Sequence, residues 1–313
     1  MHTTDKSIIL APFDESLPPE RRTAIAISMS ELVIEMVTHV ICHTLVDYRE
    51  QLQANSRLTV AHAFLQRATS THLCNHKLTA EGITLSYKGQ PFELHEEFKT
   101  MTLTRSVYEH LAMFYFLFEH PHSDEERDIV WKYWQINSKK NLLDGTADTI
   151  GTTDQARSSL VSEIENLRSQ ILATPIGQQC HQKLGRWTDI STPASNGSIE
   201  FELTEGRYSV RRVSYSQAWR YLFNNDDMAL FYRHLSMHCH PVYEGLVQYQ
   251  SQSESDEGTD AIPLYFSCSF LAQLCSLFLR QIPKGKSLLK TEFSKHQQQL
   301  FNALAQLTHE QQS

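Results

Sequence analysis

The segment from Tyr232 to Pro241 carries the residue types that phosphate and proton-transfer chemistry require. On a helix, Arg233 and His240 lie seven residues apart and share the accessible face, whereas His238 lies at the edge of the apolar stripe. An arginine can clamp a phosphate through two parallel hydrogen bonds, and a histidine can move a proton near neutral pH. The spacing therefore predicts a site that handles phosphate without a metal. The alternative is a solvated helix face with a core His238.

Arg233 and the two histidines also resemble a known motif. Arg233 followed by His238 resembles the R-x4-6-H motif of HEPN domains, and His240 fits the longer spacing of that motif. HEPN domains are α-helical bundles, often dimeric, and many of them are metal-independent ribonucleases or relics of such enzymes. The resemblance implies that Arg233 contacts the scissile phosphate and that His238 or His240 acts as acid or base. It further implies RNA as a partner and a homodimer. Tyr232 and Ser236, which flank Arg233, are candidate substrate-binding residues.

A broader likeness covers about residues 95–245. The order of features in this region is similar to a family of uncharacterised bacterial all-helical proteins. Its markers are the segment 105–109 (RSVYE), Tyr133-Trp134, Trp187, Tyr232 with Leu235-Ser236, and His240-Pro241. The likeness implies a helical fold, and in it His240 is the matched histidine.

The second candidate is Arg105 with Glu109, four residues apart on a strongly apolar predicted helix. A charge pair on such a helix is costly unless each partner is satisfied. The functional interpretation is that the pair lines a polar, substrate-binding pocket together with the Arg233 face. The structural interpretation is an ion pair at the wetter end of the helix.

Histidine pairs at four-residue spacing form a third candidate: His39/His43, His72/His76 and His234/His238. This spacing can hold a metal on one helix face. The row that contains His39 and His43 lies largely away from its apolar stripe, which favours a solvated face, and His72 lies within its own stripe. We therefore expect no bound metal and no cofactor, and a metal-dependent bundle enzyme is a distant alternative.

A basic run is interleaved with aromatic residues between positions 207 and 220. Its members are Arg207, Arg211, Arg212 and Arg220, with Tyr208, Tyr215 and Trp219 between them. Such a run could contact phosphates and stack bases. In an acidic protein the ordinary interpretation is an exposed hairpin.

The amino-acid composition limits the classes of fold and function that remain. The chain has 313 residues, 41% of them apolar, and a formal net charge of −8, which argues against a chain-wide basic surface for nucleic acid. Only 11 Gly and 10 Pro are present, which favours long helices over a sandwich or barrel. The fold class expected is all-α, a multi-helix bundle with one or two small β-hairpin insertions. Without catalytic activity, such a chain would be a helical interaction protein.

Hydrophobic periodicity predicts helices joined by few loops. Helices are expected over 19–53, 56–77, 98–119, 123–140, 156–173, 175–184, 214–223, 226–239, 264–281 and 288–306, with hairpins over 83–94 and 197–213 and polar loops over 141–155 and 250–260. The helix 98–119 should be the buried centre, with Tyr108, Leu111, Ala112, Tyr115 and Leu235 largely buried. We expect a single domain over residues 1–313, with 20–80 and 95–310 as its subdivision.

The cellular compartment is inferred from the length of the apolar stretches in the sequence. The stretch 1–22 contains only four consecutive apolar residues, too few for a signal peptide. Leu264–Leu279 is 16 residues long and interrupted by polar residues, which favours a buried core helix over a membrane span. The six cysteines have no C-x-x-C spacing and apolar neighbours, which favours buried thiols. These patterns predict a cytoplasmic protein with no membrane partner.

Overall fold

The computed structural model describes residues 11–87, 90–94, 97–146, 154–195, 197–223, 227–238 and 261–306. The protein is all-α, and its described residues add two antiparallel two-stranded β-hairpins, as the sequence predicts. The chain forms two compact units: unit 1 comprises Met1–Leu111 with Trp219–Ser313, and unit 2 comprises Ala112–Ala218. The single domain, and its subdivision into 20–80 and 95–310, stay predictions.

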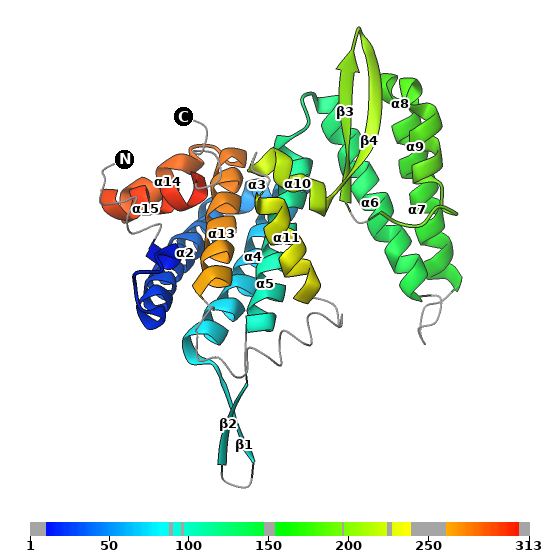
Figure 1. Ribbon diagram of the computed structural model, residues 1–313. Coiled ribbons are helices and arrows are strands. Elements are labelled where there is room, and N and C mark those ends of the chain that lie inside the picture. Colours follow the sequence, from blue (N-terminus) through cyan, green and yellow to red (C-terminus); the bar gives the residue numbers. More distant parts are fainter. Residues whose placement is uncertain are drawn as a thin grey trace. The chain divides into compact units, whose positions relative to one another are not determined.

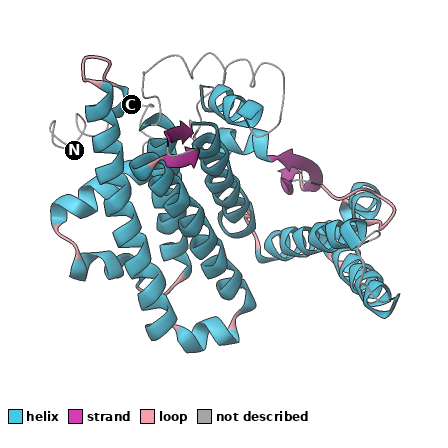
Figure 2. Cartoon of the chain, turned by 90° about the horizontal axis from the view of Figure 1, so that it is seen from below, coloured by secondary structure: helices cyan, strands magenta, loops and turns pink. Residues whose placement is uncertain are grey.

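Unit 1 is built from long helices that lie side by side (Figures 1 and 2). In chain order its elements are η1 (Ala11–Phe13), α2 (Pro19–Asp47), α3 (Arg49–Ala54), α4 (Ser56–Glu81), β1 (Ile83–Tyr87), β2 (Gln90–Leu94), α5 (Glu97–Phe114), α10 (Tyr215–Leu222), α11 (Asp227–His238), α13 (Ala261–Gln281), α14 (Gly285–Glu292) and α15 (Lys295–Gln306). Helices α5 and α10 cross the boundary between the units by a few residues.

The core of unit 1 forms around α13, whose described side chains are buried along almost the whole helix. It packs on α2, α4 and α15. Helix α5, which begins the expected buried centre 98–119, packs on α13 as well, because Tyr108 contacts Phe270 and the Thr104 hydroxyl donates to the Pro263 carbonyl oxygen. Arg105 and Glu109 lie on its wetter face. Tyr108, Leu111, Ala112 and Leu235 are buried as predicted.

Two helices of unit 1, Pro19–Asp47 and Ala261–Gln281, are long and apolar enough to cross a membrane by length and composition alone. In α13, 83% of the apolar window is buried inside the protein. Burial of this kind is typical of a core helix. In α2 only 39% of the window is buried, and two such helices are weak evidence for a membrane span.

Several element boundaries differ from the prediction. The predicted helix 288–306 is two helices, α14 and α15, because Phe293 is extended and Ser294 begins a new helix. Helix α6 (Asp124–Thr146) runs six residues further than expected, so the polar loop does not begin at Asn141. Tyr115 is only partly buried, because a π-helical turn, η2 (Tyr115–Glu119), begins there and changes the helical phase. Cys42 and Cys74 are exposed rather than buried, since both lie on outward faces of their helices.

Unit 2 combines a helical group with a β-hairpin. After η2 and α6 its elements are α7 (Asp154–Ala173), α8 (Pro175–Gln179), α9 (His181–Thr188), β3 (Gly197–Thr204) and β4 (Arg207–Ser214). Both residues of the hairpin turn, Glu205 and Gly206, have positive φ, as a type I′ turn requires. Strand pairing places Ile199 opposite Arg212 and Glu200 opposite Arg211, so successive arginines point to opposite faces.

Candidate functional site

Helices α5 and α11 of unit 1 meet in a polar cluster made by Arg105, Glu109 and Tyr232. The Arg105 Nε donates to Glu109 Oε1 at 2.8 Å, and the Tyr232 hydroxyl donates to the same oxygen at 3.2 Å. The Arg105 guanidinium also lies 5.5 Å from the centroid of the Tyr232 ring. The two charged side chains are 21% and 30% exposed. The Arg105–Glu109 pair predicted from the i, i+4 spacing is thus present. Tyr232, another predicted substrate-binding residue, is hydrogen-bonded to it.

The cluster lies on an aromatic floor. The rings of Tyr108 and Tyr232 are 5.0 Å apart, and Tyr108 also contacts Phe270 of α13. Burial raises the pKa of the Tyr232 hydroxyl, and the Glu109 carboxylate raises it further. A neutral Tyr232 is therefore a hydrogen-bond donor to Glu109 throughout the physiological pH range. The arrangement fixes the rotation of α11 about its own axis.

That rotation exposes one face of α11. Arg233 is exposed, whereas Tyr232 and Leu235 are buried on the opposite side. The hydroxyl of Ser236 donates to the Tyr232 carbonyl oxygen at 2.8 Å, so this predicted substrate-binding group is bonded to its own helix. Burial lowers the pKa of His234, the residue next to Arg233. Of the predicted site residues, the structure brings Arg105, Glu109 and Tyr232 together and leaves Arg233 facing outward.

The two candidate histidines fall at the end of α11. His238 is the last residue of the helix, and its side chain lies outside the described part of the structure. His240 lies outside the described residues altogether, as does the acidic loop expected over 250–260. Convergence of Arg233 with either histidine stays a prediction.

The other histidine pairs have different environments. His72 is fully buried, and its two ring nitrogens share hydrogen bonds with Ser30 (2.9 Å) and Ser267 (2.8 Å). His43 pairs with Asp47 at 2.8 Å, and the His39 ring lies 5.7 Å from that of His43. Within the residues described, no three His, Cys, Asp or Glu side chains are placed to hold a metal ion.

Sequence reasoning missed a histidine–carboxylate contact in unit 2. His120, directly after the π-helical turn, lies 3.5 Å from a Glu200 oxygen, and Arg211 pairs with the other oxygen of Glu200. Burial lowers the pKa of His120, and the Glu200 charge opposes that shift. His120 and Glu200 are 80 residues apart, so spacing gives no signal for this contact.

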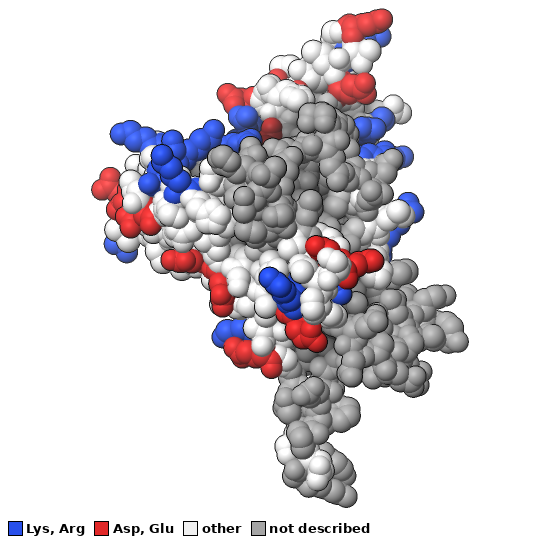
Figure 3. Space-filling model, turned by 60° about the vertical axis from the view of Figure 1, so that its left-hand side comes forward, with Lys and Arg blue, Asp and Glu red and all other residues white. Residues whose placement is uncertain are grey.

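The basic run is divided between two elements, because Arg207, Arg211 and Arg212 lie in β4 whereas Arg220 lies in α10. Arg207, Arg211 and Arg220 are exposed, whereas Arg212 is half-buried against Trp187. Figure 3 shows one face of the protein, on which acidic and basic side chains are interspersed, with the most extended group of Lys and Arg at the upper left. The prediction of an ordinary exposed hairpin holds for Arg207 and Arg211, whereas Arg220 lies outside the hairpin.

Comparison with known proteins places the chain in a family without assigning an activity. No curated protein and no solved structure matches it. The model of a family of unknown function (DUF5677) matches residues 68–259, which is more than half of the chain and includes the segment 105–109 and Tyr232. The likeness expected over 95–245 to an uncharacterised helical family is confirmed at that level. The chain belongs to this family of unknown function.

Proposed function

We propose that α11 carries a metal-independent, HEPN-like site that binds or cleaves RNA, with Arg233 and either His238 or His240 as its reacting groups. The observation that carries the proposal is the hydrogen bond from Tyr232 to the Arg105–Glu109 pair. It supports a rigid α11 on which Arg233 is held outward beside the predicted histidines. A preorganised arginine binds phosphate at a lower entropic cost than a mobile one.

The chemistry assigned to these groups is balanced without a metal. The histidine accepts the proton of a ribose 2′-hydroxyl, whose oxygen then attacks the adjacent phosphorus. The bond from phosphorus to the 5′-oxygen breaks, and the leaving oxygen takes a proton from a general acid, leaving a 2′,3′-cyclic phosphate. Arg233 donates to the phosphate oxygens, on which negative charge increases in the transition state. Arg105 and Glu109 are positioning residues in this scheme, and no cofactor is required.

The test is RNA cleavage in the presence of EDTA. End-labelled single-stranded and structured RNAs are incubated with the wild-type chain and with Arg233→Ala, His240→Ala and His238→Ala. We expect cleavage by wild type and its loss in Arg233→Ala and His240→Ala with an unchanged melting temperature. His238→Ala should destabilise the protein, because its helical phase places it toward the apolar stripe. Arg49→Ala, an exposed arginine of unit 1, is the matched control and should cleave like wild type.

A second function is favoured by one observation on the same helix. Leu230 is 62% exposed, and it lies three residues before Arg233, so the two share the outward face of α11. An exposed apolar residue on such a face suits a protein–protein contact, either a homodimer or a non-catalytic interaction. If no RNA is cleaved or bound, and Leu230→Glu changes the mass measured by light scattering, the interaction protein replaces the RNA-acting one. A cytoplasmic location is part of both proposals.

A further inference from the structure

In unit 2, one edge of the Arg212 guanidinium lacks an acceptor. The guanidinium lies over the Trp187 indole, 5.0 Å from the ring centroid. Its Nε and Nη2 atoms are buried, and neither has a hydrogen-bond partner among the described residues. These two atoms form the edge with which arginine holds a carboxylate or a phosphate through parallel hydrogen bonds. Buried charged donors without partners are costly, so this edge is suited to an incoming oxyanion.

The hairpin and the indole hold Arg212 in place. Arg212 lies opposite Ile199 in the strand pairing, and Ile199 is fully buried. Arg211 points to the other face, where it pairs with Glu200. The nearest carboxylate of the hairpin is thus taken by the neighbouring arginine, and Arg212 is left on the face of Trp187.

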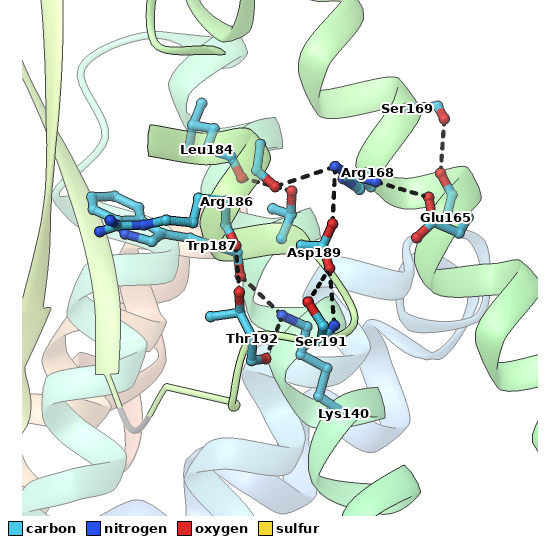
Figure 4. Close-up of polar contacts among 12 residues, drawn as sticks. Lys140, Glu165, Arg168, Ser169, Leu184, Arg186, Trp187, Asp189, Ser191 and Thr192 are labelled. Carbon is cyan, nitrogen blue, oxygen red and sulfur yellow. Dashed lines mark hydrogen bonds and ion pairs between the residues drawn. The ribbon is translucent and has the colours of Figure 1, made fainter. Parts of the chain in front are cut away.

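A second cation, Lys140 of α6, contacts the same residue, Trp187. Lys140 is 2% exposed, and its Nζ donates to the carbonyl oxygens of Trp187 (2.9 Å) and Thr192 (3.0 Å) (Figure 4). An ammonium group has three donors, and two of them are used in these bonds. Burial lowers the pKa of Lys140 to about 8, and the positive charge of Arg212 contributes to this shift. Two cations that repel each other are stabilised by an anion between them.

Two acids, Asp189 and Asp144, lie close enough to Lys140 to raise its pKa, but no hydrogen bond or ion pair joins either of them to Lys140 or Arg212 among the described residues. Asp189 pairs with Arg168 at 3.3 Å and also accepts from the backbone N–H and the hydroxyl of Ser191. Glu165 pairs with Arg168 at 3.2 Å. Figure 4 shows these acids turned toward Arg168. The Nε–Nη2 edge of Arg212 therefore has no carboxylate partner among the described residues.

We propose that the Nε–Nη2 edge of Arg212 and the ammonium group of Lys140 bind a phosphate group against Trp187. Phosphate is favoured over carboxylate because its tetrahedral oxygens can accept from the arginine edge and from a lysine at the same time. The phosphate can belong to a small phosphate monoester or to the backbone of RNA. The site is on unit 2 and does not depend on the function proposed for α11.

The test is calorimetric titration of the full chain with inorganic phosphate in a chloride buffer. Wild type should bind one phosphate. Arg212→Lys keeps the charge but lacks the two-pronged edge, and we expect affinity at least about tenfold weaker, since a charged bidentate contact is lost. Arg212→Gln should lose binding as well. Arg186→Gln is the matched control, because Arg186 is exposed and lies on the same helix as Trp187. Far-UV circular dichroism verifies that each variant is folded.

A second readout needs no variant. In the NMR spectrum of the arginine Nε–H groups, phosphate should shift one resonance downfield in wild type. Absence of this shift together with no heat of binding would overturn the proposal, as would equal affinity in wild type and both Arg212 variants.

Titration with a short single-stranded RNA separates the two sources of phosphate. RNA binding that depends on Arg212 assigns the site to a phosphodiester, and binding of inorganic phosphate alone assigns it to a monoester. RNA binding at α11 would be lost in Arg233→Ala, whereas binding at this site would be lost in Arg212→Gln, so failure of the α11 proposal and failure of this site are distinguishable.

Discussion

Acid should destabilise unit 1 through His72. The imidazole is fully buried between Ser30 of α2 and Ser267 of α13. Burial lowers its pKa to about 3, with a smaller contribution from His76. The folded protein therefore keeps His72 neutral at a pH where the unfolded chain protonates it.

The sign and size of the effect follow from this difference. Between the unfolded pKa of about 6.5 and the folded value of about 3, the unfolded chain binds one more proton at this residue. The contribution of His72 to stability is complete above pH 6.5 and is lost as the pH falls toward 3. Each pH unit in that window costs up to about 1.4 kcal/mol, so lowering the pH from 6.5 to 4.5 should cost about 2 kcal/mol.

Urea unfolding of wild type and His72→Gln across pH 4.5–7.5, followed by far-UV circular dichroism, measures this contribution. Other buried histidines, such as His62 and His110, are present in both proteins and cancel in the difference. At pH 7, His72→Gln should have a lower free energy of unfolding than wild type. When the pH is lowered from 6.5 to 4.5, however, that free energy should fall by about 2 kcal/mol less in His72→Gln than in wild type. His181→Gln, at an exposed position, should track wild type. Parallel curves for wild type and His72→Gln would refute the reasoning.

Three further predictions concern packing, the polar cluster and metals. Leu111→Ala and Leu235→Ala should each lower the free energy of unfolding by about 2–5 kcal/mol. Leu230→Ala, on the exposed face, is the control and should change this free energy by less than about 0.5 kcal/mol. A change in Leu235→Ala as small as in Leu230→Ala would contradict the packing of α11. Tyr232→Phe should cost about 1 kcal/mol in urea unfolding, because it removes the hydrogen bond to Glu109, and an unchanged stability would mean that this bond does not hold α11. Elemental analysis of protein purified without a chelator or His tag should find no stoichiometric transition metal, and one zinc, iron or manganese per chain would reverse the expectation.

Much of the fold could be predicted because local rules decide it. Alternating residues around Glu205-Gly206 predict the second hairpin, and Ser123 followed by Glu126 predicts the start of α6, where the Ser123 hydroxyl accepts from the Glu126 N–H at 3.1 Å. The break before α15 also had a local signal. Ser294 and Gln297 form a reciprocal capping pair, but the apolar periodicity of the flanking residues suggested one continuous helix.

The site could be predicted only where its partners are close in sequence. The Arg105–Glu109 pair follows from i, i+4 spacing on a helix. Its bond to Tyr232 spans 123 residues, and the Lys140–Trp187 bond spans 47. Such contacts depend on how helices pack, and composition and periodicity do not specify which polar side chains then meet.

The π-helical turn at Tyr115–Glu119 has a consequence for aligning relatives of this chain. The His120 N–H donates to the Tyr115 carbonyl oxygen at 2.9 Å, five residues back instead of four. The turn therefore contains one residue more than an α-helical turn, as if a single codon had been inserted. A homologue with a one-residue gap here would close this last turn as an α-helical one, and the side chain that follows it, at the position of His120, would be rotated by about 100° relative to the preceding part. Alignments should place any such gap inside 115–119, so that His120 is matched with a residue of the same orientation.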